Sequence, residues 1–254
     1  MMSRTAAILW TRIAVITAVI AALEALCRTG IIEPLVMIPP SEMLTALFDL
    51  MRSGQLVDDL VQTSTAVAAA LVISVVLGGA LGALIHALPR VRRAAGPLLA
   101  SYYSIPVFVF YPLLIALFGL NMVPLIVIGA VFAIAAMVIA TLNGMDRVPP
   151  VMAKTARILG LSRTTTLVTI TLPAAAPFLV TGLKLALAYS FIGVIAGEFI
   201  LAGSGLGFSI AYAYNNFDSR TMYAVMLLVL TLVTAVNGIL HVIEQRMLRR
   251  RTGT

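Results

Sequence analysis

The apolar residues of this chain fall into long runs separated by short polar breaks, and this alternation predicts the fold. A run of about twenty mostly uncharged residues matches the length of a helix that crosses a bilayer. We interpret six such runs as membrane spans, at about residues 7–27, 64–88, 97–118, 122–142, 177–199 and 221–243. The expected fold class is therefore an all-α polytopic membrane protein with about six transmembrane helices.

The first run resembles a signal peptide, because Arg4 and Arg12 flank its start and Cys27 ends it. The residues just before Cys27 lack the small side chains that cleavage requires. We therefore expect a retained first helix. Together with the more polar stretch that follows, it makes residues 1–60 an N-terminal segment ahead of the main domain at residues 61–250.

Within that polar stretch the sequence predicts a short amphipathic helix at residues 41–53. Two prolines and Ser41 precede it, and Gly54 ends it, which is typical of a helix start and a helix end. Its apolar side chains share one face: Met43, Leu44, Leu47, Leu50 and Met51. The helix is too short and too charged to cross a membrane, so we expect it to lie along the outer surface.

Two of the spans have unusual composition. Gly78, Gly79 and Gly82 give the second span a thin face suited to close helix packing. The third span contains Pro106 and Pro112, which should kink it and free carbonyl groups beside a polar cavity. The same span holds a cluster of aromatic residues, of which we take Tyr102 and Tyr103 as candidates for a translocation pathway. Packing of interfacial aromatic rings is the alternative explanation.

A polar, basic island at residues 153–173 interrupts the apolar pattern between the fourth and fifth spans. Pro149 and Pro150 favour a helix start just before it, and Gly160 favours a helix end. Ser162 is a suitable cap for a second short helix. The island is expected to form a protruding pair of helices that docks on another protein. An ordinary basic loop, or a strand at the β-branched residues 164–171, are the alternatives.

The spacing in this island resembles the cytoplasmic signature of permease subunits of bacterial ABC importers. Ala156 is followed by three residues and Gly160, then by nine residues, Ile170, one residue and Leu172-Pro173. The family has an acidic residue two positions before this alanine, whereas this chain has Lys154. Two other phrases are similar to the nitrate, sulfonate and taurine permeases, namely residues 38–42 and the Ser-Gly-Leu-Gly turn at residues 204–207.

The resemblance implies a type I ABC importer permease fold in which a coupling region, residues 147–173, contacts a separate ATPase. The coupling residues it points to are Lys154, Ala156, Arg157, Gly160, Leu161, Ser162 and Pro173. It also implies a second permease copy, two ATPase subunits that bind ATP and Mg²⁺, and an extracytoplasmic solute-binding protein. The expected function is passage of a small, anionic solute, such as a sulfonate, nitrate or taurine.

Composition and charge support a membrane transporter over other classes. The chain has 254 residues, of which 61% are hydrophobic and 11% are charged. Of its 17 basic residues, 13 lie at breaks that the six-span scheme puts on one side: Arg4, Arg12, Arg90, Arg92, Arg93, Arg147, Lys154, Arg157, Arg163, Arg246, Arg249, Arg250 and Arg251. This asymmetry predicts that both termini are in the cytoplasm, and it explains the basic charge without a nucleic-acid partner. The resemblance implies that the membrane is the bacterial inner membrane.

The residue types that carry catalysis are scarce. With one cysteine and two histidines, neither an intrachain disulfide nor a histidine or cysteine metal cluster is expected. The chain has no G-x-x-x-x-G-K-S/T phosphate-binding loop, so ATP hydrolysis is expected in a separate subunit. We therefore predict no catalytic residue, no metal and no cofactor in this chain.

Two ionisable residues lie within the predicted fifth span, Lys184 and Glu198. Ionisable groups inside a membrane are costly, so they tend to face a cavity or a partner. We take both as candidates for the pathway. The alternatives are that Lys184 extends its amine to the membrane boundary and that Glu198 is interfacial. An ion-driven secondary transporter that uses both residues is the competing functional class.

Overall fold

The computed structural model describes residues 4–252, and all regular secondary structure in that range is helical. The α-helices are α1 (Arg4–Arg28), α2 (Pro40–Ser53), α3 (Val57–Ala87), α4 (Pro89–Ser101), α5 (Tyr111–Phe118), α6 (Met122–Asp146), α7 (Pro150–Ile158), α8 (Arg163–Thr166), α9 (Leu172–Leu201), α10 (Leu206–Asn215) and α11 (Ser219–Thr252). Five helices are long and apolar enough to cross a membrane, or six if one bent pair counts as a span. The prediction of an all-α fold with about six spans is confirmed.

Helices α3, α6 and α9 pack together as the centre of the bundle. Small residues allow this close approach, as the sequence predicted. A methyl group added to Gly78 would lie 2.8 Å from Cβ of Met137, and one added to Gly82 would lie 2.7 Å from Cβ of Thr141. The prediction was wrong for Gly79, which has no neighbour within 4 Å and faces away from the contact.

The predicted third span is broken rather than only kinked. Its two parts, Pro89–Ser104 and Val107–Phe118, meet at 79°. Pro106 lies at the break. Proline has no backbone N–H to donate to the preceding turn, so the helix is interrupted there. The helix also begins earlier than residue 97, so that Arg90, Arg92 and Arg93 belong to α4 instead of to a loop.

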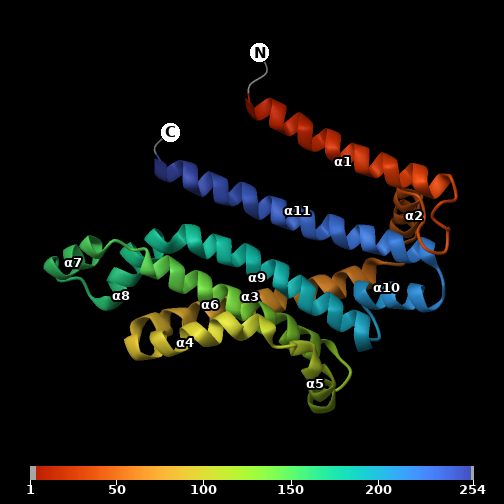
Figure 1. Cartoon of the computed structure of the whole chain (residues 1–254). Helices are drawn as coiled ribbons and strands as arrows, with labels where there is room; N and C mark the ends of the chain where they lie inside the picture. The colour runs from red at the N-terminus through yellow and green to blue at the C-terminus, as the bar shows by residue number, and fades with distance from the viewer. Residues whose placement is uncertain (1–3, 253–254) are drawn as a thin grey trace.

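The two ends of the bundle differ in content (Figure 1). Helices α7 and α8 lie at the end on the left of the figure, where α11 also ends, and the start of α1 points the same way. Helices α2, α5 and α10 lie at the opposite end. We call these the knob end and the far end, after the knob, which is the predicted coupling region at residues 147–173.

At the far end, α2 packs against α11 and connects to α1. Glu24 of α1 accepts hydrogen bonds from the Ser41 backbone N–H (3.0 Å) and hydroxyl (2.6 Å), and it pairs with Arg28. The predicted amphipathic helix is confirmed and ends at Gly54, with φ of 73°. Leu44 and Met51 do not belong to the packed face, because both are exposed. The expected segment boundary at residue 60 falls inside α3.

Candidate functional site

The knob is built by local signals in its own sequence. Helix α7 begins at Pro150, directly after Pro149. It ends at Ile158, and Gly160 follows with φ of 63°. The Leu161 N–H donates to the Ala156 carbonyl oxygen at 3.0 Å. This left-handed residue after a helix is the arrangement that glycine favours. Ser162 then caps α8 by accepting the Thr165 N–H at 3.1 Å.

The surface of the knob mixes charge with exposed apolar side chains. Lys154 and Arg157 are both exposed. Ile158 is 85% exposed and Leu159 is 66% exposed, although both are large and apolar. Of the other predicted coupling residues, Gly160, Ser162 and Pro173 are exposed, Leu161 is half-buried and Ala156 is buried. The structure therefore brings the predicted set together on one protrusion, with Ala156 as its internal packing residue.

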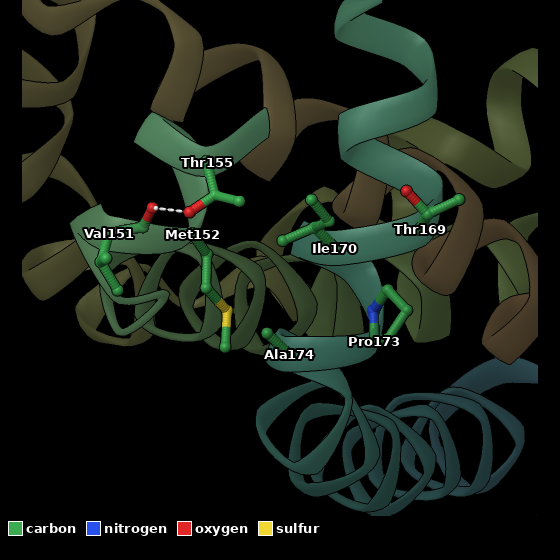
Figure 2. A pocket seen from close by; sticks show the side chains of 7 residues that line it. All are labelled: Val151, Met152, Thr155, Thr169, Ile170, Pro173 and Ala174. Carbon is green, nitrogen blue, oxygen red and sulfur yellow. Dashed lines mark hydrogen bonds between the residues drawn. The ribbon is translucent and has the colours of Figure 1, made fainter. Parts of the chain in front are cut away.

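A shallow apolar groove of about 530 Å³ runs between α7 and the start of α9 (Figure 2). Its lining side chains come from both helices and from the turn between them: Val151, Met152, Thr155, Thr169, Ile170, Pro173 and Ala174. The Thr155 hydroxyl is turned inward to its own helix, where it donates to the Val151 carbonyl oxygen at 3.0 Å. The groove therefore presents mainly hydrocarbon.

The strand considered for residues 164–171 does not form. Helix α8 is followed by a π-helical turn, Leu167–Thr171, that leads directly into α9. Threonine hydroxyls here donate to backbone carbonyl oxygens of the preceding turn; the Thr169 hydroxyl, for example, donates to the Thr165 carbonyl oxygen at 2.6 Å. Tertiary context outweighs β-propensity here, because the turn continues a span of 37 residues, Thr164–Ile200.

The two candidate tyrosines lie at the broken span. The ring of Tyr103 stacks on Tyr189 of α9, with 5.0 Å between the ring centroids. The Tyr102 hydroxyl donates to the Val131 carbonyl oxygen of α6. A pocket of about 200 Å³ beside Tyr103 and Tyr189 is also lined by Asn143 and Thr181. Tyr103 therefore borders a cavity between the helices, whereas Tyr102 fixes the break against α6.

Lys184 faces a partner helix. Its amine forms an ion pair with the Glu244 carboxylate of α11, and it lies 3.2 Å from Nδ1 of His241. The Thr181 hydroxyl donates to the same carboxylate at 3.2 Å. The two charged side chains are 21% and 17% exposed. Sequence reasoning singled out Lys184 but missed Glu244, although that residue lies in an otherwise apolar stretch near the last span.

Glu198 is fully buried, between α9, α3 and the start of α10. Its carboxylate accepts the Thr63 hydroxyl at 2.8 and 2.9 Å, and it accepts the Gly207 backbone N–H at 2.9 Å. Thr63 was not predicted. Thr63 and Glu198 are 135 positions apart, and nothing in the sequence near Thr63 indicates that they meet. The only signal was that Thr63 is a polar residue in an apolar run.

Comparisons with known proteins agree with the fold. Residues 74–249 match the family described as "Binding-protein-dependent transport system inner membrane component". The taurine transport system permease protein TauC of Escherichia coli is 30% identical over 190 residues, covering 72% of this chain and 68% of that protein. The nitrate import permease protein NrtB of Leptolyngbya laminosa is 28% identical over 181 residues, covering 71% and 65%. Among solved structures, a chain of the inward-facing MetNI methionine ABC transporter has a TM-score of 0.67 at 20% identity, covering 76% of this chain and 95% of that chain.

These matches confirm the resemblance stated from the sequence and the permease fold. They exclude the alternative of an ion-driven secondary transporter, since members of this family are components of binding-protein-dependent transport systems. They also show that the chain is a multi-pass, inner-membrane transport component rather than a catalytic subunit. The chain belongs to the family of inner-membrane permease components of binding-protein-dependent ABC transporters.

Proposed function

We propose that this chain forms the translocation pathway for a small anionic solute and is driven by a separate ATPase that docks on the knob. The observation that supports the docking site is the exposed apolar surface of Ile158 and Leu159 on a helix pair beyond the membrane spans. Helix α7 is too short to span a membrane, and exposed apolar side chains of this size are typical of protein interfaces. The neighbouring groove adds a concave apolar surface to the same interface.

The orientation follows from the charges. The knob end holds the knob and the end of α11, and the start of α1 points the same way (Figure 1). Thirteen of the 17 basic residues lie in these segments and at residues 90–93. Cytoplasmic loops of membrane proteins carry an excess of basic residues. We therefore place the knob end in the cytoplasm, where ATP is available, and the far end outside, where a solute-binding protein delivers the solute. ATP and Mg²⁺ bind to the ATPase, and this chain needs no cofactor of its own.

The solute class follows from relatives. The chain is similar to permeases named for taurine and for nitrate, which are small solutes with anionic oxygens. Within this chain, the pocket at Tyr103 and Tyr189 lies between spans and is lined by one of the predicted pathway residues, Tyr103. We assign that pocket to the pathway, with a second copy of the chain completing it. Lys184 is assigned to helix packing instead, because Glu244 already neutralises it.

The contact at Lys154 should differ from that of the family. The family pattern has an acidic residue at this position, which typically meets a basic residue of the ATPase. Lys154 is exposed and basic, so the ATPase surface opposite it should be acidic or neutral.

A site-specific photo-crosslink tests the docking site. A benzophenone amino acid in place of Ile158 should give a crosslinked adduct whose second protein contains a G-x-x-x-x-G-K-S/T motif, identified by mass spectrometry. The matched control places the same group at Ile239, which is also exposed but lies on the apolar part of α11. The proposal is contradicted if the Ile158 position crosslinks only lipid while the Ile239 position captures the ATPase.

A further inference from the structure

The first turn of α10 is capped by side chains from two other helices. The first backbone N–H groups of a helix have no partner within the helix, and a local side chain usually accepts one of them. Gly205 precedes α10, has φ of 103° and offers no side chain. Asp59 and Thr63 of α3 and Glu198 of α9 take this role. They accept the N–H groups of Gly205 (2.8 Å), Leu206 (2.9 Å) and Gly207 (2.9 Å), respectively.

These groups form one closed network, which we call the clamp: Asp59, Gln62, Thr63, Glu198 and residues 204–209. The Thr63 hydroxyl both accepts from α10 and donates to Glu198. The Ser204 hydroxyl donates to Gln62 at 2.7 Å, and the Ser209 hydroxyl donates to Asp59. Thr63 and Glu198 have no exposed surface. Carboxylates at a helix N-terminus are also favoured by the helix dipole, so the network stabilises α10 in one position.

The backbone is packed too tightly around the clamp for α10 to shift. A methyl group added to Gly207 would overlap the Ile195 carbonyl oxygen and Cβ of Glu198. A methyl group added to Gly205 would overlap the Glu198 carboxylate itself. Glycine at both positions lets α10 lie directly on the last turns of α9. Any sliding of one helix along the other would break buried hydrogen bonds that water cannot replace.

Helix α9 joins this clamp to the knob. The helical segment Thr164–Ile200 is continuous over 37 residues, which corresponds to about 55 Å at 1.5 Å per residue. It begins inside the knob with α8, and its last turns hold Glu198 beside α10 (Figure 1). The same helix therefore touches the proposed ATPase-docking surface at one end and α10 at the other.

We propose that Glu198 is a positioning residue through which movement of the knob reaches α10 at the far end. The clamp makes α10 and the far ends of α3 and α9 a single rigid unit, so that a displacement of α9 moves α10 with it. This inference rests on the proposed function, because an ATPase must move the knob. It assigns Glu198 to mechanical coupling rather than to contact with the solute.

Hydrogen exchange on the complex of this chain with its ATPase, in lipid nanodiscs, tests the link. Two peptides are followed, one from the knob (residues 150–163) and one from the clamp and α10 (residues 203–211). In the wild type, adding the non-hydrolysable analogue AMP-PNP should change the exchange rate of both peptides. Thr63→Val keeps the shape of the side chain but removes the hydroxyl, so it should speed exchange at residues 203–211 about tenfold.

The decisive result is the response to nucleotide. In Thr63→Val the knob peptide should still respond to AMP-PNP, whereas residues 203–211 should no longer do so. Thr63→Ser restores the hydroxyl and should restore the response. Ser190→Ala is the matched control, because Ser190 is equally buried on α9 but its hydroxyl has no hydrogen-bond partner among the described residues.

Three outcomes separate the two proposals. If the knob responds to nucleotide in the wild type but residues 203–211 do not, the positioning role of Glu198 is wrong while ATPase docking stands. If both peptides respond equally in the wild type and in Thr63→Val, the clamp does not transmit movement, and the inference is also wrong. If the knob itself does not respond in the wild type, the proposed function fails first.

Discussion

The two ends of α9 are stabilised in opposite ways. At the knob end, short helices are shaped by their own caps, and they leave Ile158 and Leu159 exposed beside an apolar groove. At the far end, Glu198 is enclosed, and its partners come from α3 and α10. The far end is therefore closed by contacts within this chain, whereas the exposed apolar side chains of the knob are available to a partner. The difference supports the proposal that an ATPase docks at the knob end.

Glycine shows the same contrast. Gly160 at the knob is required for its backbone conformation, since φ is 63° and an added methyl group would meet nothing within 4 Å. Gly207 at the far end is required for space, because an added methyl group would overlap backbone and side-chain atoms of α9. Substitutions at these two positions should therefore fail for different reasons.

The largest effect is expected for Gly207→Ala. The added methyl group meets a backbone carbonyl that cannot rotate away, so α10 must move and the clamp must open. We expect a loss of about 3 kcal/mol in the free energy of unfolding, measured in detergent micelles. Gly238→Ala is the control, because that glycine has open space on α11. Equal stability of the two variants would refute the tight packing at the far end.

Between the two ends, Lys184→Met tests the contact of α9 with α11. The substitution removes the ion-pair partner of the Glu244 carboxylate, whose side chain is only 17% exposed. It should lower the free energy of unfolding by about 2 kcal/mol. The double variant Lys184→Met with Glu244→Leu removes both charges and should recover most of that loss. If the double variant is less stable than the single one, the ion pair is not what joins these helices.

A smaller effect is expected for Gly160→Ala at the knob. A side chain at positive φ costs about 1 kcal/mol locally, and this should distort the knob without changing the stability of the bundle. ATPase binding, measured by co-purification, should weaken. Gly160→Asn provides the comparison, because asparagine tolerates the left-handed conformation and should bind nearly as well as wild type. Equal loss with both variants would mean that the side chain's bulk, not φ, matters there.

The smallest effect on stability is expected for Lys154→Glu. Lys154 is exposed and makes no described contact within the chain, so the unfolding transition should not change. Assembly with the ATPase should be unchanged or weaker, because the opposing surface is expected to be acidic or neutral. Stronger assembly would show that the ATPase keeps the basic residue typical of the family.

The knob could be predicted from the sequence, because the signals that shape it are local. The two prolines, Gly160 and Ser162 set where α7 and α8 begin and end, and each acts over a few residues. The spans were readable because about twenty apolar residues in a row have few alternatives. The break at Pro106 was foreseen only as a kink, since the angle depends on how α5 packs rather than on proline alone.

The clamp could not be predicted, because its contacts join segments that are far apart in the sequence. Glu198 was recognised as unusual, but its partner Thr63 lies on a different helix and resembles any threonine in an apolar run. Glu244 was missed in the same way as the partner of Lys184. Contacts between distant helices depend on register and rotation within the bundle, which the hydrophobic pattern of a single helix does not specify.

The account depends most on the two ends of α9 lying on opposite sides of the membrane, with the knob in the cytoplasm. Single cysteines in place of Ile158 and of Tyr212, in a Cys27→Ala background, test this with an impermeant thiol reagent, since both positions are exposed. The Ile158 position should be labelled only in inverted membrane vesicles, and the Tyr212 position only in intact cells with a permeabilised outer membrane. Labelling of Ile158 from outside, or of both positions from the same side, would contradict the account.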